Sequence, residues 1–357
     1  MVDIILGAFF GDEGKGQCVN NLCDEPSVRQ KTVVVRFSGA NQVGHNVTCN
    51  GLNHCFRNFG SGTLKNVSTY WSEYCVCDLH TVLTEALELQ SLGIKPKIIF
   101  SPFCELVTPF DVINQWNNSA NRSHGTVGTG FKSVLDRVKN GYSLTILDAQ
   151  NLLILREKVY NIGEHYYNMN SNMPMTNLND WIFEVNKMAN FFQIADISCL
   201  NKFDHIIFEG SQGILLDQKH GVMPFCTPSN TTSKNAMKII HNLHISDHVR
   251  VNYVCRPYIT RHGNGPLLTS TSILDIDDQN NQYNDFQKTF RSCEFDVDLL
   301  AHSIKIDSYY SVGSEHRVVF SHGNELTKKL YDKVKTTLPS KLGMYIDFAS
   351  FEYENWL

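Results

Sequence analysis

The sequence has few of the features that assign a protein to a membrane, a nucleic acid or an oxidising compartment. None of its apolar runs reaches the roughly 18–20 residues that cross a bilayer, and no charged-then-apolar leader precedes the first predicted strand. There is no cluster of Lys and Arg, and the formal net charge of −5 argues against a nucleic-acid-binding surface. Eleven cysteines are scattered without a C-x-x-C pair, which is typical of reduced thiols. We therefore expect a cytoplasmic protein that binds neither a membrane nor a nucleic acid.

Two common nucleotide-binding signatures are also missing. A glycine-rich loop follows the first predicted strand, but its spacing is not the G-x-x-x-x-G-K-S/T of the P-loop. The guanine-reading N/T-K-x-D is absent after the strand predicted at residues 318–320, where the chain continues S-H-G-N-E. A GTPase-like switch protein would carry both a glycine loop and the guanine-reading motif, so the second absence argues against that class.

The composition is that of a globular chain with a large core. Hydrophobic residues make up 42% and charged residues 19% of 357 positions, and no linker or break in composition divides them. Short apolar runs predict buried strands at residues 2–6, 31–37, 97–100, 204–208 and 251–260, and the apolar spacing of residues 79–93 predicts an amphipathic helix. We expect one α/β domain spanning residues 1–357, with a central, mainly parallel sheet and glycine-rich nucleotide-binding loops at the carboxyl ends of its strands.

The first glycine-rich loop carries charged residues between its glycines. It consists of Gly11, Asp12, Glu13, Gly14, Lys15 and Gly16. A strand, a glycine loop and a helix in succession aim backbone N–H groups and a helix N-terminus at a phosphate. Because a carboxylate repels a phosphate, Asp12 suggests a metal ligand or a catalytic base, and Lys15 is the natural counter-charge to a phosphate. A tight turn after the first strand is the plainer alternative for the glycines.

The G-D-E-G-K-G sequence of this loop resembles the opening of adenylosuccinate synthetases, which couple a 6-oxopurine nucleotide to L-aspartate with a nucleoside triphosphate. A second block, residues 209–232, reads E-G-S-Q-G-I-L-L-D-Q-K-H-G-V-M-P-F-C-T-P-S-N-T-T. It is similar to the family's E-G-A-Q-G-x-x-L-D-x-x-x-G-T-Y-P-Y-V-T-S-S-N-T-T, without a gap. By this resemblance Gln212 contacts the purine nucleotide and Thr227 contacts its phosphate.

The loop after the second predicted strand extends the resemblance. It reads S-G-A-N-Q-V-G-H-N-V over residues 38–47 and is similar to the family's G-G-H-N-A-G-H. His45 matches the family's general acid, and Gly44 matches the glycine whose carbonyl binds Mg²⁺. Gln42 stands where the family usually has an asparagine in contact with the nucleotide phosphate, so that contact must be rearranged. Taken alone, a single loop histidine is more often structural.

A further glycine-rich sequence, G-T-V-G-T-G, resembles the family's G-T-T-G-R-G loop around the nucleotide monophosphate. It places Thr126 and Val127 in the nucleotide site, although Val127 replaces a threonine and Thr129 replaces an arginine. In the family, a later arginine reaches the phosphate of the neighbouring subunit. It has no clear match here, and Arg137 and Lys139 are the substitutes that the sequence offers.

Towards the C-terminus the resemblance is weaker. The family has T-G-R-R-R-R-x-G-W-F/L-D, whose backbone and arginines hold the aspartate substrate, and the corresponding stretch keeps only Lys288 and Arg291 as cations. Arg291 is the better choice for this site because a guanidinium binds a carboxylate bidentately. Residues 260–266, T-R-H-G-N-G-P, are similar to the family's T-R-V-G-A-G-P, and we expect them to shape a pocket wall without catalytic residues.

The resemblance implies a ligase in which Asp12 takes the N1 proton of the purine, so that the 6-oxygen attacks the γ-phosphate. His45 stabilises that oxygen and then assists departure of phosphate, after which the amine of aspartate attacks C6. Mg²⁺, bound by Gly44 and Asp12, neutralises the phosphoryl oxygens. The family forms homodimers, so we expect a homodimer whose partners are small molecules: a purine nucleoside monophosphate, L-aspartate and a nucleoside triphosphate.

The identity of the nucleotides is open. Ordinary family members use IMP and GTP, whereas a phage branch aminates dGMP to N6-succino-2-amino-2′-deoxyadenylate for diaminopurine DNA. This chain has the compact length of archaeal and phage members, and its departures at Gln42 and Val127 lie where the nucleotide is recognised. We expect dGMP with ATP or dATP, in the host cytoplasm if the source is viral. Use of IMP with GTP is the alternative, ahead of a GTPase-like switch or an inactive relative.

Overall fold

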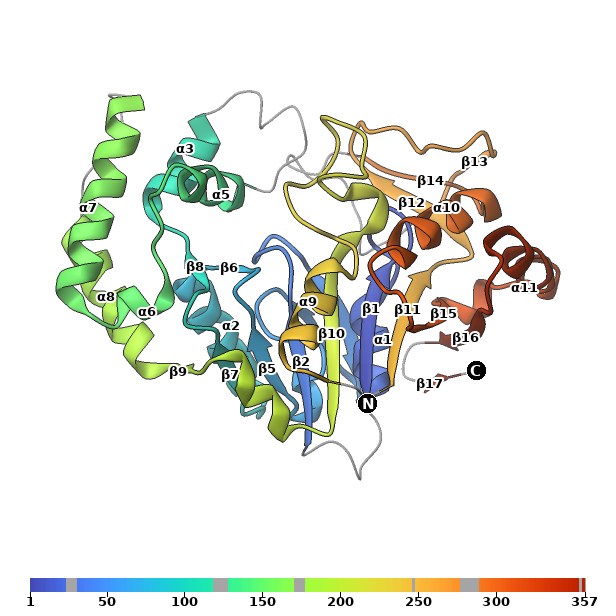
Figure 1. Cartoon of the computed structure of the whole chain (residues 1–357), viewed down its shortest axis with the longest axis horizontal. Coiled ribbons are helices and arrows are strands. Elements are labelled where there is room, and N and C mark those ends of the chain that lie inside the picture. The colour runs from blue at the N-terminus through green and yellow to red at the C-terminus, as the bar shows by residue number, and fades with distance from the viewer. Residues whose placement is uncertain are drawn as a thin grey trace.

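A wide, twisted sheet runs through the middle of the molecule, with helices on both faces and at both ends (Figure 1). The computed structural model describes residues 1–23, 31–117, 128–169, 177–245, 248–276 and 289–352, and the backbone of residues 355 and 356. The strand order is β17-β16-β15-β11-β1-β10-β2-β5-β7-β9. Every neighbouring pair is parallel except β16 and β17, which confirms the mainly parallel sheet predicted from the sequence.

The strands of the large sheet are β1 (Val2–Gly7), β2 (Thr32–Arg36), β5 (Ser68–Trp71), β7 (Ile98–Phe100), β9 (Gln193–Ile194), β10 (His205–Gly213), β11 (Val249–Cys255), β15 (Glu315–Phe320), β16 (Asp347–Glu352) and β17 (Asn355–Trp356). Smaller sheets pair β3 (His45–Cys49) with β4 (Leu52–Phe56), β6 (Val76–Cys77) with β8 (Glu105–Leu106), and β14 (Phe290–Glu294) with both β12 (Tyr258–His262) and β13 (Ile273–Leu274).

The α-helices are α1 (Lys15–Leu22), α2 (Leu79–Ser91), α3 (Pro109–Asn117), α5 (Phe131–Lys139), α6 (Ile146–Ala149), α7 (Leu152–Met169), α8 (Leu178–Phe191), α9 (Lys234–Asn242), α10 (Val297–Ser308) and α11 (Lys328–Leu342). Helices α7 and α8 lie at the end of the molecule beyond β9, and α11 lies near the other end, close to β15 and β16 (Figure 1). No helix among the described residues has the length and apolarity needed to span a membrane.

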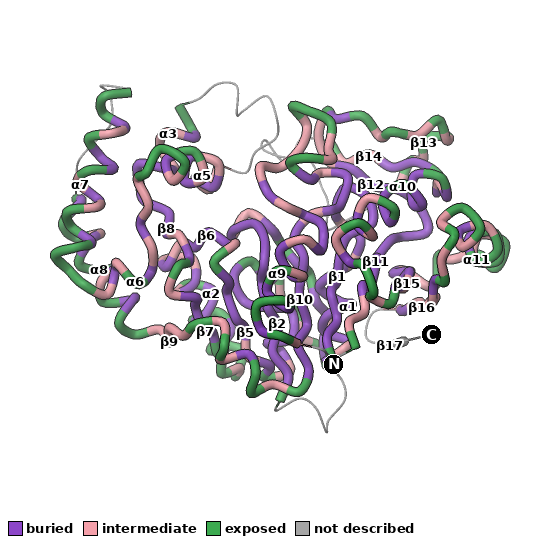
Figure 2. The backbone as a smooth tube through the Cα atoms, viewed as in Figure 1, coloured by how far each residue is buried: buried purple, intermediate pink, exposed green. Residues whose placement is uncertain are grey.

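The central strand β1 is buried along its whole length because it is flanked on both sides and covered on both faces. Since neighbouring side chains of a strand point to opposite faces, Ile4 and Ile5 belong to different clusters. Ile4 packs in the large cluster that includes residues of α9 and α10, and Ile5 packs with Val19 of α1. Figure 2 shows the buried backbone concentrated in these central strands, whereas α7 and α11 carry long exposed stretches. The sheet is therefore a rigid base for the loops at its edge.

The strand predicted over residues 251–260 is wrong in its extent. The chain forms β11 in the large sheet, leaves it at Arg256, and then forms β12 in the small antiparallel sheet. Pro257 follows the break, and proline has no N–H to continue a ladder. The strand predicted at residues 204–208 is longer than expected, because β10 continues to Gly213. The helix predicted over residues 79–93 is confirmed as α2.

Arg137, a substitute for the missing family arginine, is fully buried on α5 and bound within its own chain. Its Nε donates to Asp111 Oδ1 at 2.9 Å, and its Nη1 and Nη2 donate to the carbonyls of Tyr142 and Leu106. The hydroxyl of Tyr166 donates to the same Asp111 oxygen at 2.8 Å. The suggestion that Arg137 reaches a nucleotide is therefore wrong, and this side chain instead ties α5 to α3.

We expect Arg137→Met to lower the free energy of unfolding by about 3–5 kcal/mol, because it leaves Asp111 buried without its cation. Denaturant unfolding measures the change. The matched control is Lys139→Met, which removes an exposed charge from the same helix and should change stability by no more than about 0.5 kcal/mol. Equal stability of the two variants would contradict the structural role of this ion pair.

Candidate active site

A cavity of about 1600 Å³ opens where the parallel strands β1, β2, β10, β11 and β15 reach their carboxyl ends. The residues singled out in the sequence that line it are Gly11, Asp12, Glu13, Gly14, Lys15, Gly16, Gln42, Gly44, His45, Gln212 and Thr227. Thr126 and Val127 lie outside the described residues. Ordinary small-molecule sites measure about 300–1000 Å³. The cavity therefore has room for more than one ligand.

The loop between β1 and α1 is held by an ion pair within itself. Glu13 accepts hydrogen bonds from the backbone N–H groups of Phe9 at 3.0 Å and Gly11 at 2.9 Å. Its other oxygen lies 2.9 Å from Nζ of Lys15, and both side chains are buried. A side chain at Gly7 would overlap this pair, since a Cβ there would stand 2.4 Å from Glu13. The charge of Lys15 is thus balanced inside the loop, and its contact with a phosphate stays a prediction.

Asp12, in the loop between β1 and α1, has an uncommon backbone conformation. Its φ is 62°, in the left-handed region that non-glycine residues seldom adopt. Its carboxylate opens on the cavity, with 31% of the side-chain surface exposed, and lies 3.4 Å from Nε2 of His262. Burial of the carboxyl group among the cavity walls raises the pKa of Asp12, although His262 acts in the opposite direction. A raised pKa makes this carboxylate a better proton acceptor.

His45 begins β3 and is paired with a carboxylate of the central sheet. Its Nδ1 lies 2.6 Å from Oε1 of Glu209, and Oε1 also accepts a hydrogen bond from the hydroxyl of Ser61. The other oxygen, Oε2, accepts from the backbone N–H of Ser61 at 3.0 Å. Burial lowers the pKa of His45, despite the opposing effect of Glu209, and so favours the neutral imidazole. Its Nδ1 faces the carboxylate and is the nitrogen that carries the proton. Burial alone would raise the pKa of Glu209, but His45 and Arg36 outweigh it and the pKa is lowered.

The other ring nitrogen of His45, Nε2, is buried and has no hydrogen-bond partner among the described residues. His45 can pack directly against the first glycine-rich loop because residue 16 is a glycine and has no side chain. A Cβ at Gly16 would stand 2.7 Å from Cβ of His45 and 2.9 Å from the hydroxyl of Ser61. Since His45 lines the cavity, its unpaired nitrogen is the atom left to act on a ligand.

Gln42 and Gln212 both line the cavity, and Gln212 has a buried oxygen that no described residue satisfies. Gln212 has a left-handed φ of 57°, and its buried Oε1 has no partner within the described chain. Gln42 accepts a hydrogen bond from the hydroxyl of Thr129 at 3.4 Å. Gln42 and Thr129 both differ from the residues at the matching positions of the family motifs. Their hydrogen bond shows that the two substituted positions are neighbours in the structure. Backbone strain next to unsatisfied polar atoms is typical of functional sites.

The arginine predicted to bind a carboxylate faces another way. Arg291 lies on β14, and its Nη2 donates to the carbonyls of Gly263 and Gly265. It is not one of the cavity-lining residues of the described chain, whereas Arg256 and Arg261 are. Arg291 thus braces the 263–265 turn, and its predicted contact with substrate stays untested. Burial lowers the pKa of Arg261 to about 10, which still leaves it charged.

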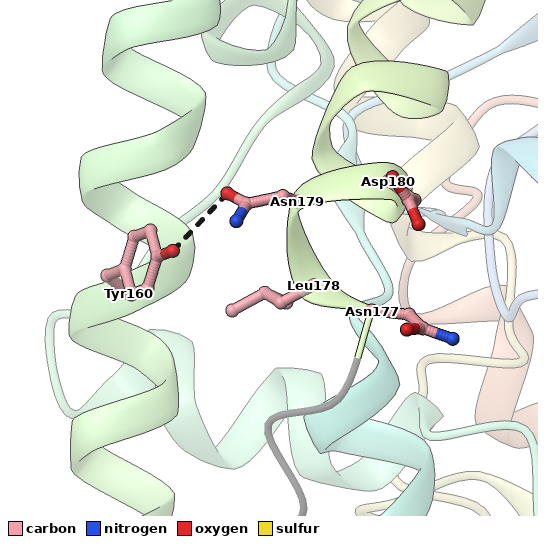
Figure 3. Close-up of a pocket in the computed structure, with 5 residues that line it drawn as sticks. All are labelled: Tyr160, Asn177, Leu178, Asn179 and Asp180. Carbon is pink, nitrogen blue, oxygen red and sulfur yellow. Dashed lines mark hydrogen bonds between the residues drawn. The ribbon is translucent and has the colours of Figure 1, made fainter.

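A smaller hollow of about 510 Å³ lies between α7 and the start of α8 (Figure 3). Its lining consists of Tyr160 and residues 177–180, and the hydroxyl of Tyr160 donates to Asn179 at 3.3 Å. None of these residues belongs to a motif found in the sequence. The cavity at the end of the sheet is therefore the candidate active site.

Four residues of this site were not assigned a role from the sequence: Glu209, Ser61, Arg256 and His262. Glu209 stands at the start of the E-G-S-Q-G sequence, so its position near the carboxyl end of a strand was a usable signal. Arg256 precedes a proline after a buried strand, which is a weaker signal. The contacts of Ser61 with Glu209 and of His262 with Asp12 depend on packing between segments that are distant in the sequence. No local sequence pattern predicts such contacts.

The model of the protein family described as adenylosuccinate synthetase matches residues 4–322. The chain belongs to the adenylosuccinate synthetase family. An adenylosuccinate synthetase of Haemophilus influenzae is 30% identical over 282 residues, which cover 74% of this chain and 64% of that protein. One of Actinobacillus succinogenes is 28% identical over 377 residues, covering 99% of this chain and 84% of that protein. The chain thus spans under two thirds of the length of several adenylosuccinate synthetases that it matches.

Solved structures of this adenylosuccinate synthetase fold agree with the architecture over nearly the whole chain. The fully ligated adenylosuccinate synthetase of Plasmodium falciparum superposes with a TM-score of 0.77 at 15% identity, covering 99% of both chains. The succinoaminodeoxyadenylate synthetase of cyanophage S-2L, bound to dGMP and dATP as an energy donor, superposes with a TM-score of 0.67 at 14% identity, covering 98% of this chain and 91% of the other. At these identities the likeness establishes the fold.

Proposed function

We propose that this protein is a ligase that joins L-aspartate to C6 of a 6-oxopurine nucleoside monophosphate, with a nucleoside triphosphate as phosphoryl donor. The observation that carries the proposal is the meeting of two unlike groups in one cavity. Asp12 supplies a carboxylate with a raised pKa, and His45 supplies a neutral imidazole whose Nε2 is unpaired in the described chain. A purine 6-oxo group is a poor leaving group, so it needs a base at N1 and stabilisation at the oxygen before an amine can displace it.

The proton movements follow from the two environments. Asp12 takes the N1 proton, which its raised pKa favours, and the 6-oxygen becomes a nucleophile for the γ-phosphate. Glu209 keeps a proton on Nδ1 of His45. When a phosphate lies beside Nε2, its negative charge and that of Glu209 both favour protonation of this nitrogen. The imidazolium, protonated from solvent, then hydrogen-bonds the phosphoryl oxygens. When the aspartate amine attacks C6, the C6–O bond breaks, phosphate leaves with the former 6-oxygen, and the amine gives up one proton to the departing phosphate.

A magnesium ion fits the oxygen donors of the cavity. Mg²⁺ is commonly held by one or two carboxylates together with substrate phosphates and water, and not by a cage of protein ligands. The carboxylate of Asp12 and the carbonyl of Gly44 are such donors, since both residues line the cavity. In the described part of the chain no three His, Cys, Asp or Glu side chains form a closed metal site. The ion would supply positive charge to the phosphoryl oxygens during transfer.

We propose dGMP as the acceptor nucleotide. The support is the pattern of departures from the family motifs: Gln42 and Thr129 depart and contact each other, whereas Asp12 and His45 are retained. Substitution of residues that recognise the nucleotide, while the residues that carry out the chemistry are kept, favours a different nucleotide substrate. The cyanophage S-2L neighbour, whose structure contains dGMP, is in line with this choice. IMP shares the N1–H and the 6-oxo group and is the second acceptor to test.

The experiment combines the purified protein with L-aspartate, Mg²⁺, ATP and either dGMP or IMP. Phosphate release that requires both the nucleotide and aspartate is expected, and mass spectrometry should show the succino-nucleotide of dGMP. Release without aspartate would point to a GTPase-like or ATPase activity and overturn the ligase. A product from IMP alone would overturn only the choice of acceptor and leave the ligase chemistry standing.

We expect ATP or dATP, and not GTP, as the phosphoryl donor. The cavity end near β15 and β16 is lined by Ser321, His322, Asn324 and Phe351. Glu325 is not among the lining residues of the described chain, and its carboxylate interacts with Tyr258. Guanine N1–H and N2–H₂ require an acceptor such as a carboxylate, whereas the amide of Asn324 can donate to and accept from adenine.

The value of kcat/KM should therefore be at least about tenfold higher with ATP or dATP than with GTP, which is the size of one lost base contact. Asn324→Asp should shift this ratio towards GTP because it supplies the missing carboxylate. Steady-state kinetics with each triphosphate, at saturating aspartate and dGMP, gives the ratio. Equal kcat/KM for GTP and ATP in the unaltered protein would refute this assignment.

We also propose a homodimer. In the family an arginine of the neighbouring subunit reaches the nucleotide phosphate, and Arg137 cannot take that role because it is paired with Asp111. Since Arg137 is paired in the same way in every copy, the dimer is proposed from membership of the family, and another cation would have to meet the phosphate. Sedimentation velocity at micromolar concentration should show twice the chain mass, and a monomer that is fully active would overturn this proposal.

A further inference from the structure

Residues of the pocket wall, which consists of β12 and the turn that joins it to β11, contact the first glycine-rich loop. Nε of Arg256 donates to the carbonyl oxygen of Asp12 at 2.6 Å. The hydroxyl of Thr260 donates to the carbonyl oxygen of Gly11 at 3.2 Å. Nε2 of His262 lies 3.4 Å from Oδ2 of Asp12. The first two contacts hold the backbone of the loop, and the third reaches the carboxylate itself.

These contacts meet the loop where its backbone is strained. Asp12 has a φ of 62°, which costs conformational energy for any residue with a Cβ. Such a conformation persists only when its surroundings hold it in place. Arg256 and Thr260 do so through the carbonyl oxygens of the two peptide groups that flank the Asp12 Cα. The carboxylate would still rotate about its last bond, because that torsion has a broad energy well.

His262 is placed to restrict that rotation. It is the last residue of β12, and its backbone pairs with Phe290 of β14. The ring of Phe290 packs against the imidazole with the ring centres 5.3 Å apart. Only 13% of the His262 side chain is exposed. The family motif that this segment resembles has valine at this position, and valine has no atom that can bind a carboxylate.

We propose that His262 is a positioning residue, which holds Oδ2 of Asp12 so that Oδ1 is presented to N1 of the purine. The inference rests on the proposed function, in which Asp12 accepts that proton. Holding one carboxylate oxygen leaves the other aimed at the reacting atom, and a base that is a fraction of an ångström out of place loses rate. The pocket wall therefore acts on the chemical step as well as on the shape of the site.

The test compares His262→Val with His262→Gln in the full-length protein. We expect His262→Val to lower kcat about tenfold while KM for the nucleoside monophosphate changes less than about twofold. His262→Gln keeps an N–H at nearly the same place, so its kcat should be no more than about threefold below that of the unaltered protein. Thermal unfolding of each variant shows whether the fold is intact. If His262→Val does not fold, the comparison of His262→Gln with the unaltered protein decides, and a larger loss overturns the inference.

A double-mutant cycle with Asp12→Asn separates positioning from direct contact with substrate. If His262 acts through Asp12, adding His262→Val to Asp12→Asn should cause little further loss of kcat. Additive losses, a rise in KM with kcat unchanged, or full activity of His262→Val would each overturn the inference. These outcomes are distinct from failure of the proposed function, because that failure appears as an unaltered protein that forms no succino-nucleotide.

Discussion

Asp12→Asn is expected to lose about 10²- to 10⁴-fold in kcat while it still binds nucleotide, because removal of a general base typically costs that much. Asparagine adopts the left-handed conformation more readily than most residues, so the φ of 62° at this position can be kept. The substitution removes the negative charge and leaves a side chain of nearly the same shape. Phosphate release measures kcat, and isothermal calorimetry measures binding of the nucleoside monophosphate.

The matched control is Asp332→Asn, which removes an exposed carboxylate from α11; Asp332 is not among the residues that line the cavity in the described chain. It should leave kcat within about twofold, as expected of a surface substitution. Turnover by Asp12→Asn at the rate of the unaltered protein would show that N1 loses its proton to another group. Loss of nucleotide binding in this variant would show that Asp12 acts in binding instead.

His45→Ala is expected to reduce aspartate-dependent phosphate release by a similar factor, about 10²- to 10⁴-fold, because it removes the imidazole that meets the phosphoryl group. The rate of phosphate release by Glu209→Gln should lie between the rates of His45→Ala and of the unaltered protein. Glutamine keeps the size of the side chain but loses the charge that favours an imidazolium, and its amide can donate to Nδ1 and so move the ring proton to Nε2. Single-turnover phosphate release compares the three proteins.

Ser61→Ala serves as the graded control, since it removes one of two hydrogen bonds from Ser61 to Glu209 and leaves the carboxylate in place. Its loss of rate should be smaller than that of Glu209→Gln. An insoluble His45→Ala together with a fully active Glu209→Gln would show that the pair is structural. His45→Gln, which fills more of the space, then distinguishes loss of the fold from loss of the chemistry.

Much of this site could be predicted because parallel strands collect their carboxyl ends at one edge. The loops that follow β1 and β2 and the end of β10 were expected to meet there, and the structure brings Asp12, His45 and Gln212 into one cavity. Apolar runs located β1, β2, β7, β10, β11 and β15, because strands buried on both faces are apolar along their length. The strands β5, β9, β16 and β17 of the same sheet were not predicted. The exception among the predicted strands, residues 251–260, contained Pro257 within an otherwise apolar run.

The unpredicted features are those in which one side chain satisfies another. Lys15 was read as free to meet a phosphate, but it pairs with Glu13 two residues earlier. Arg137 was read as an available cation, yet it is buried against Asp111. The pairing of His45 with Glu209 joins residues 164 positions apart. Residue types and their spacing in the sequence indicate which chemistry a side chain can perform. Only the folded structure shows whether that side chain already has an ion-pair or hydrogen-bond partner.

The pairing of His45 with Glu209 makes the chemistry of the imidazole depend on the docking of a hairpin against the central sheet. Glu209 belongs to the central sheet, whereas His45 begins a hairpin whose two strands pair only with each other in the described structure. If the hairpin lifts from the sheet, the ring nitrogen Nδ1 loses its carboxylate partner and the imidazole loses the charge that favours its protonation. The reactivity of the ring is thereby tied to the docking of the hairpin.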